Sequence, residues 1–191
     1  MTPNRAHHGS GPAPDERRLA SVAAESLQIV RKPLLFVDID GVISLFGFPA
    51  DRRPAGAWLN VDGVVHLLSA DARGHLLALS EHFELVWASG WEEKANEHLP
   101  LALELPGPLP YLTFAPADTH DHWKLAALEA HAGDRPLAWV DDGHDDACRA
   151  WAAAREAPTL LVSTDPARGL TAADVARLEA WAAQHAPKPR G

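Results

Sequence analysis

The architecture of this chain follows from one stretch, Leu34-Leu35-Phe36-Val37-Asp38-Ile39-Asp40-Gly41-Val42. An apolar run without polar alternation is typical of a strand buried on both faces of a parallel sheet. In such sheets, ligands bind just beyond the carboxyl ends of the strands. Asp38 and Asp40 stand at that end, and Gly41 permits a sharp turn. The stretch predicts a candidate active site, although Asp-x-Asp-Gly is also a common turn that merely ends a strand.

Four further apolar segments predict strands, and helical patterns separate them. The strands are expected at 84–88, 109–114, 137–140 and 159–163, and the helices at 71–82, 91–99, 122–131, 145–155 and 172–185. This alternation predicts an α/β fold, a Rossmann-like parallel sheet of five core strands with helices on both faces. Weak strand patterns at 57–61 and 64–68 predict a β-hairpin flap over the edge of the sheet.

Composition places the chain among globular proteins. Hydrophobic residues make up 47% of its 191 residues, which suits one folded domain, expected over 31–186. Residues 1–30 are expected to be a disordered or weakly helical extension, and 187–191 a short tail. No apolar run predicts a membrane span or a signal peptide, so a cytoplasmic location is expected. The net charge of −9 disfavours duplex nucleic acid, which requires a basic face.

Polar residues follow three of the expected strands. Ser89-Gly90 comes after the second strand, where free N–H groups and a helix start could hold a phosphate oxygen, although Ser89 also suits an ordinary helix cap. Asp141-Asp142 ends the fourth strand, and two adjacent acids at a buried strand end repel unless a cation or a proton relieves them. Asp145 and Asp146 instead suit the first turn of a helix.

Lys124 is expected near the start of a helix, where the helix dipole disfavours a cation. A nearby anion would explain its place, although it could be an ordinary surface lysine. Trp91 and Trp123 flank Ser89 and Lys124 and could stack on a base. His120 and His122 do not share a helical face, and no third ligand accompanies them, so they are weak metal candidates. Cys148, the single cysteine, suits a buried helical position.

In this order, the motifs resemble those of the haloacid dehalogenase (HAD) superfamily. The resemblance implies a phosphatase in which Asp38 is the nucleophile and a Mg²⁺ ligand, and Asp40 is the general acid and base with its backbone carbonyl on the metal. Ser89, Gly90 and Lys124 would bind the phosphoryl group. Asp141 would be the remaining metal ligand, with Asp142 in support.

A closer resemblance, to the HAD domain of Swiss Army Knife RNA-repair proteins, is carried by three strings. They are Trp87-Ala88-Ser89-Gly90-Trp91-Glu92 with Ala95-Asn96, Trp139-Val140-Asp141-Asp142, and Asp165-Pro166 with Gly169-Leu170-Thr171. This resemblance implies a phosphorylated RNA or DNA end as substrate. The gaps on either side of Ser89 leave no room for a cap domain, so an open site is expected, with Arg52 and Arg53 of the hairpin region contributing to specificity. The alternative function is a non-catalytic HAD-like module that binds phosphate or a protein. The sequence leaves the oligomeric state open.

Overall fold

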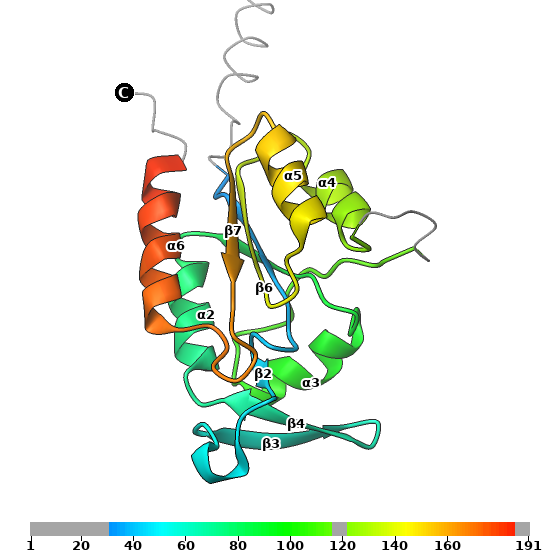
Figure 1. Cartoon of the computed structure of the whole chain (residues 1–191), viewed down its shortest axis with the longest axis vertical. Helices are drawn as coiled ribbons and strands as arrows, with labels where there is room; N and C mark the ends of the chain where they lie inside the picture. The colour runs from blue at the N-terminus through cyan, green and yellow to red at the C-terminus, as the bar shows by residue number, and fades with distance from the viewer. Residues whose placement is uncertain (1–30, 116–121, 186–191) are drawn as a thin grey trace, which may run out of the picture. The chain divides into compact units, whose positions relative to one another are not determined.

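A computed structural model describes residues 31–115 and 122–185. The expected N-terminal extension, the C-terminal tail and His120 lie outside the described residues. The main sheet consists of four parallel strands in the order β5-β1-β6-β7 (Figure 1). These strands are β1 (Leu34–Val37), β5 (Glu84–Trp87), β6 (Leu137–Asp141) and β7 (Thr159–Ser163).

Alternate residues of β1 face two separate hydrophobic layers. Leu35 and Val37 pack in the layer formed with α2 (Ala72–Ser80) and α6 (Ala172–His185). Leu34 and Phe36 pack in the layer formed with α4 (Leu125–Ala132) and α5 (Asp146–Ala154). Figure 1 shows these two helix pairs on opposite sides of the sheet. The unbroken apolar run of β1 is therefore explained by burial on both faces, as predicted.

The prediction of a full strand at 109–114 is wrong. It makes one parallel bridge, Trp87 with Tyr111, beside β5. The Trp87 N–H donates to the Pro110 carbonyl over 2.8 Å, and the Leu112 N–H donates to the Trp87 carbonyl over 2.9 Å. Pro108 and Pro110 have no N–H to donate, so the ladder cannot extend along this segment. Four named strands, and not five, form the sheet.

The predicted hairpin is confirmed. It consists of β3 (Gly56–Val61) and β4 (Val64–Ser69), and the short β2 (Ser44–Leu45) pairs with β4 to complete a second, antiparallel sheet. Asp62 and Gly63 connect the strands with φ of 52° and 87°, which is the signature of a tight two-residue turn. A short 3-10 helix, η1 (Ala50–Arg52), precedes the hairpin.

The helix after β5 begins later than predicted. α3 spans Lys94–Ala102, whereas the pattern predicted a start at Trp91. Glu92 has a φ of 48°, a left-handed conformation that cannot belong to an α-helix. Its carboxylate accepts a hydrogen bond from the Phe114 N–H over 2.9 Å. This contact joins the turn at 91–93 to the segment that bridges β5.

The described elements follow each other without an inserted cap domain, in agreement with the gap lengths in the sequence. No helix among the described residues is both long and apolar enough to span a membrane.

Candidate active site

The predicted site residues lie together at the carboxyl ends of the parallel strands. Asp38 directly follows β1, Ser89 follows β5 with one residue between them, and Asp141 ends β6. Among the described residues, the buried polar and charged side chains are Asp38, Ser44, Ser89, Lys124 and Asp141. Four of these five are predicted site residues. Because burying a polar group without a partner is costly, this concentration indicates a polar centre with its own internal contacts.

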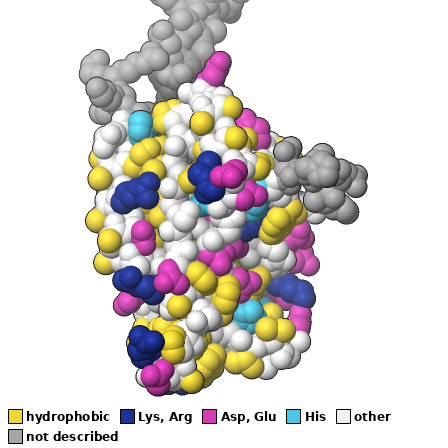
Figure 2. All heavy atoms as spheres, in the orientation of Figure 1, with side chains coloured by type: hydrophobic (Ala, Val, Ile, Leu, Met, Phe, Trp, Pro, Cys, Tyr) yellow, Lys and Arg dark blue, Asp and Glu magenta, His cyan; other side chains and the backbone are white. Residues whose placement is uncertain are grey.

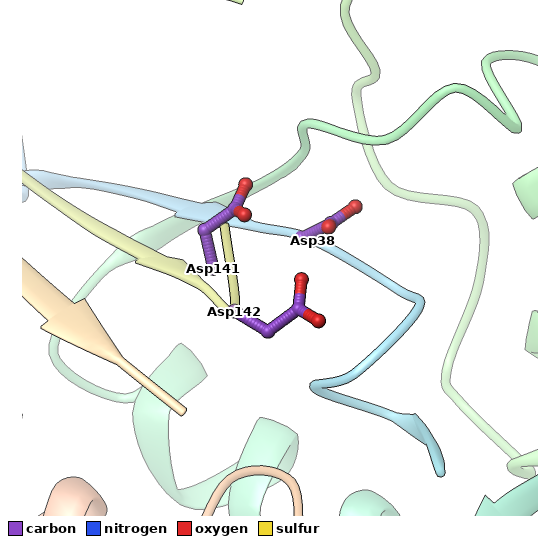
Figure 3. Close-up of side chains that lie close together, drawn as sticks. All are labelled: Asp38, Asp141 and Asp142. Atoms are coloured by element: carbon purple, nitrogen blue, oxygen red, sulfur yellow. The ribbon is translucent and has the colours of Figure 1, made fainter. Parts of the chain in front are cut away.

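Three carboxylates form one group at this centre. Asp38, Asp141 and Asp142 each offer an oxygen, and these oxygens all lie within 4.8 Å of one another (Figure 3). Carboxylate oxygens are the ligands that hard divalent cations prefer. The Asp40 carboxylate does not belong to this group. The expectation for Asp40 at the metal concerned its backbone carbonyl, and it stays a prediction.

Lys124 lies between two of the acids. Its Nζ is 3.0 Å from Asp38 Oδ2 and 2.6 Å from Asp141 Oδ2, and all three side chains are almost completely buried. Lys124 precedes α4 directly, so the helix start positions its ammonium over the strand ends. Lys124 is therefore not an ordinary surface lysine.

The acids are more numerous than the cations that compensate them. Burial raises the pKa of Asp38 to about 6; the Lys124 ammonium opposes this increase and the Asp141 carboxylate adds to it. Burial, followed by repulsion from Asp141, also raises the pKa of Asp142. Both shifts reflect burial first, and the neighbouring Asp141 carboxylate adds to them. A bound cation would relieve them, so the residues present fit a hard divalent ion.

Asp141 is held by donors that sequence patterns did not reveal. Trp139 Nε1 donates to Asp141 Oδ2 over 3.1 Å, and the Gly143 N–H donates to Asp141 Oδ1 over 2.8 Å. Trp139 lies on β6 and is fully buried. The contact of Trp139 with Asp141 could be inferred from their spacing, because residues two apart on a strand point to the same face.

Gly41 allows the closest approach in the site. It has a φ of +73°, and a Cβ added there would lie 2.4 Å from the Asp142 carboxylate. The Gly41 carbonyl accepts a hydrogen bond from Thr164 Oγ1 over 2.8 Å. The turn after Asp40 is thus packed against the end of β6, and only glycine fits.

The Ser89-Gly90 segment is a turn and not a helix start. Ser89 is buried, and the Trp91 N–H approaches its Oγ at 3.5 Å, the outer limit of a hydrogen bond. Because α3 begins only at Lys94, the positive end of that helix is three residues further on than predicted. Phosphate binding by Ser89 and Gly90 stays a prediction that rests on the hydroxyl and the turn.

The two tryptophans expected near the site differ in their surroundings. Trp91 is half-buried, and its Nε1 donates to Asp40 Oδ2 over 2.9 Å. Trp123 is 42% exposed, and its ring centroid lies 5.0 Å from Lys124 Nζ and 4.5 Å from the Phe114 ring centroid. Of the two, Trp123 is the one at the surface beside the buried lysine.

Asp145 and Asp146 serve the start of α5, as expected. The Asp145 side chain accepts from the Cys148 N–H as the helix cap, and Asp146 pairs with Arg149. Neither belongs to the acidic group.

His66 was not predicted from the sequence. It lies on β4, and its Nδ1 is 3.4 Å from Asp40 Oδ1. No local pattern could reveal this contact, because the hairpin brings together residues 26 positions apart.

The comparison with protein families agrees with the geometry of this site. The family described as "HAD domain in Swiss Army Knife RNA repair proteins" matches residues 34–175, from the first residue of β1 into α6. A comparison with curated proteins gives no match. The match covers both sheets and every element that carries a site residue. The chain therefore belongs to the HAD domain family of Swiss Army Knife RNA repair proteins.

Proposed function

We propose that the protein is a Mg²⁺-dependent phosphomonoesterase that works through an aspartyl-phosphate on Asp38. The observation that carries this proposal is the convergence of Asp38, Asp141 and Asp142 around one point, with Lys124 between the first two. A purely structural centre would gain nothing from three crowded acids, because each added charge raises the cost of burial.

Asp38, Asp141 and Asp142 would hold the cation. When bound, Mg²⁺ would neutralise charge on the phosphate and favour the ionised form of Asp38. Lys124 Nζ would donate to a phosphoryl oxygen, and the Ser89 hydroxyl would donate to another.

The chemistry then depends on two aspartates. A carboxylate oxygen of Asp38 attacks phosphorus and forms a new P–O bond, while the bond from phosphorus to the leaving oxygen breaks. Asp40 gives its proton to that leaving oxygen. In the second half, Asp40 takes a proton from water as the water oxygen attacks phosphorus, the bond to Asp38 breaks, and inorganic phosphate leaves.

The proposed substrate is a phosphorylated RNA or DNA end. The family description refers to RNA repair, and the absence of a cap among the described elements would leave the site open to a bulky substrate. Arg52 and Arg53 are exposed ahead of the hairpin and would contact the phosphates further along the strand. On the face in Figure 2, positive and negative side chains are interspersed, so a single strand end suits this surface better than a duplex.

Phosphate release from a substrate panel tests this proposal. The panel compares 3′- and 5′-phosphorylated oligonucleotides with small phosphorylated metabolites, each with Mg²⁺ or with a chelator. We expect metal-dependent release that is abolished by Asp38→Asn. Folded wild-type protein that binds Mg²⁺ but turns over no member of the panel would favour the non-catalytic binding module instead. Asp40→Asn separates the two functions, because it should retain ligand affinity and lose turnover.

A further inference from the structure

The Asp40 carboxylate is held by two elements that come from distant parts of the sequence. Asp40 Oδ2 accepts from Trp91 Nε1 over 2.9 Å, and Asp40 Oδ1 lies 3.4 Å from His66 Nδ1. The Asp40 side chain is nevertheless 46% exposed. It is therefore held by Trp91 and His66 while part of it stays accessible to a substrate.

Trp91 and His66, together called the clamp, also pack against each other. The His66 and Trp91 rings meet edge to face, with centroids 4.6 Å apart. His66 Nδ1 also lies 3.0 Å from Ser44 Oγ, so this nitrogen faces one oxygen on the turn after β1 and one on β2. An ion pair of Lys94 with Asp62 joins the first residue of α3 to the turn of the hairpin. The element that carries Trp91 and the strand that carries His66 are thus linked at a second point.

The contacts of the Asp40 carboxylate differ in chemical character from those of the nucleophile, Asp38. Asp38 contacts the amino group of Lys124, whereas the strongest contact of Asp40 is with an indole, a neutral group that donates but cannot accept. An indole N–H fixes the direction of a carboxylate without adding a positive charge beside it. This arrangement suits a group that must alternately give and take a proton.

We infer that Trp91, braced by His66, is a positioning residue that fixes the Asp40 carboxylate for proton transfer to the leaving oxygen. This inference rests on the proposed phosphatase function and extends it to selectivity among leaving groups. A substrate with a poor leaving group, such as the ribose oxygen of a nucleic-acid end, needs the proton from Asp40. A dinitrophenolate leaves readily without one. Loss of the clamp should therefore affect only the first kind of substrate.

The test compares kcat/KM for an alkyl phosphate and for dinitrophenyl phosphate in Trp91→Phe. The parameter kcat/KM is measured because it depends only on the steps up to phosphorylation of Asp38, before water attacks. Loss of a hydrogen bond to a charged group predicts a fall of about tenfold or more for the alkyl phosphate. For dinitrophenyl phosphate the fall should stay below about twofold. Asp40→Asn should give the same pattern with a larger loss, on the order of a hundredfold or more.

Trp151→Phe is the matched control. Trp151 Nε1 also donates to a carboxylate, that of Glu129 on α4, and its loss should change neither rate. His66→Leu removes the brace and should reproduce the selective loss to a smaller extent. The comparison within one variant is insensitive to the folded fraction, because misfolded protein lowers both rates equally.

Each outcome decides a specific claim. Equal losses on both substrates in Trp91→Phe, or no loss on either, overturn the positioning role while leaving the phosphatase proposal intact. Absence of metal-dependent turnover in the wild-type protein, on both substrates, overturns the phosphatase function and the inference with it. A selective loss on the alkyl phosphate, with Trp151→Phe unchanged, supports the clamp.

Discussion

Replacement of Gly41 by alanine tests the packing of the acidic centre. Gly41 has a φ of +73°, and an alanine Cβ would lie 2.4 Å from both Cγ and Oδ2 of Asp142. Since ordinary contacts begin at 3.4 Å, the Asp142 carboxylate must move by about 1 Å or more. The backbone conformation itself costs a non-glycine residue about 1–2 kcal/mol.

Gly47 provides a matched control. Its φ of +74° is nearly the same, but a Cβ added there meets no atom within 4 Å. Gly47→Ala should therefore carry only the backbone cost, about 1–2 kcal/mol. In the absence of metal, Gly41→Ala should lose at least as much free energy of unfolding as Gly47→Ala, because the collision with Asp142 adds to the backbone cost.

The two variants should differ in metal affinity. Gly41→Ala should weaken Mg²⁺ binding by about 10–100-fold, the range expected when a group that supports a metal site is disturbed. Gly47→Ala should bind Mg²⁺ as the wild type does. Urea unfolding with a chelator measures the stability, and isothermal titration with Mg²⁺ measures the affinity. Equal Mg²⁺ affinities in the two variants would refute the placement of Asp142 against Gly41 or its role at the metal.

Three further predictions concern other parts of the molecule. Lys124→Met leaves two buried carboxylates without their shared cation and should lower the free energy of unfolding by about 3–5 kcal/mol. Lys94→Met removes an exposed pair and should cost far less, so similar losses in urea unfolding would contradict the buried bridge. Burial raises the pKa of Cys148 to about 12, so its thiol should stay protonated and resist iodoacetamide in the native protein well above neutral pH, whereas it should react fully in denaturant. Since the pKa in the folded protein exceeds that in the unfolded chain, this burial contributes stability below pH ~9 that is lost as the pH rises toward 12. Gly169→Ala places a Cβ 2.4 Å from the Val42 carbonyl at a φ of +66°, and thermal unfolding should show a fall in Tm larger than that of Gly47→Ala, by at least about 2 °C.

The sequence was sufficient for the four strands of the main sheet, for the hairpin and for the residues at the strand ends. The run from Leu34 to Val37 reports burial on both faces, and a strand with such burial must lie inside a parallel sheet. Parallel strands bring their carboxyl ends to one edge, so Asp38, Ser89 and Asp141 could be grouped without coordinates. The Asp62-Gly63 turn is likewise a local property of two residues.

Two segments differ from the structure that their apolar patterns predicted. The segment at 109–114 is apolar enough for a strand, but its prolines restrict it to one bridge with β5. The pattern after Ser89 suits a helix, but the left-handed Glu92, tied to Phe114, delays α3 to Lys94. At 109–114 the prolines of the segment itself set the limit, whereas after Ser89 the helical preference is overridden by the contact with Phe114.

The sequence by itself determined which acids stand at the end of β1, because strand propensity and burial are properties of consecutive residues. Only the tertiary structure decided what each acid contacts. Lys124 reaches Asp38 from the start of α4, and Trp91 and His66 reach Asp40 from two other elements. Side-chain directions and distances between elements are set when the layers pack together, and no periodicity along the chain encodes them.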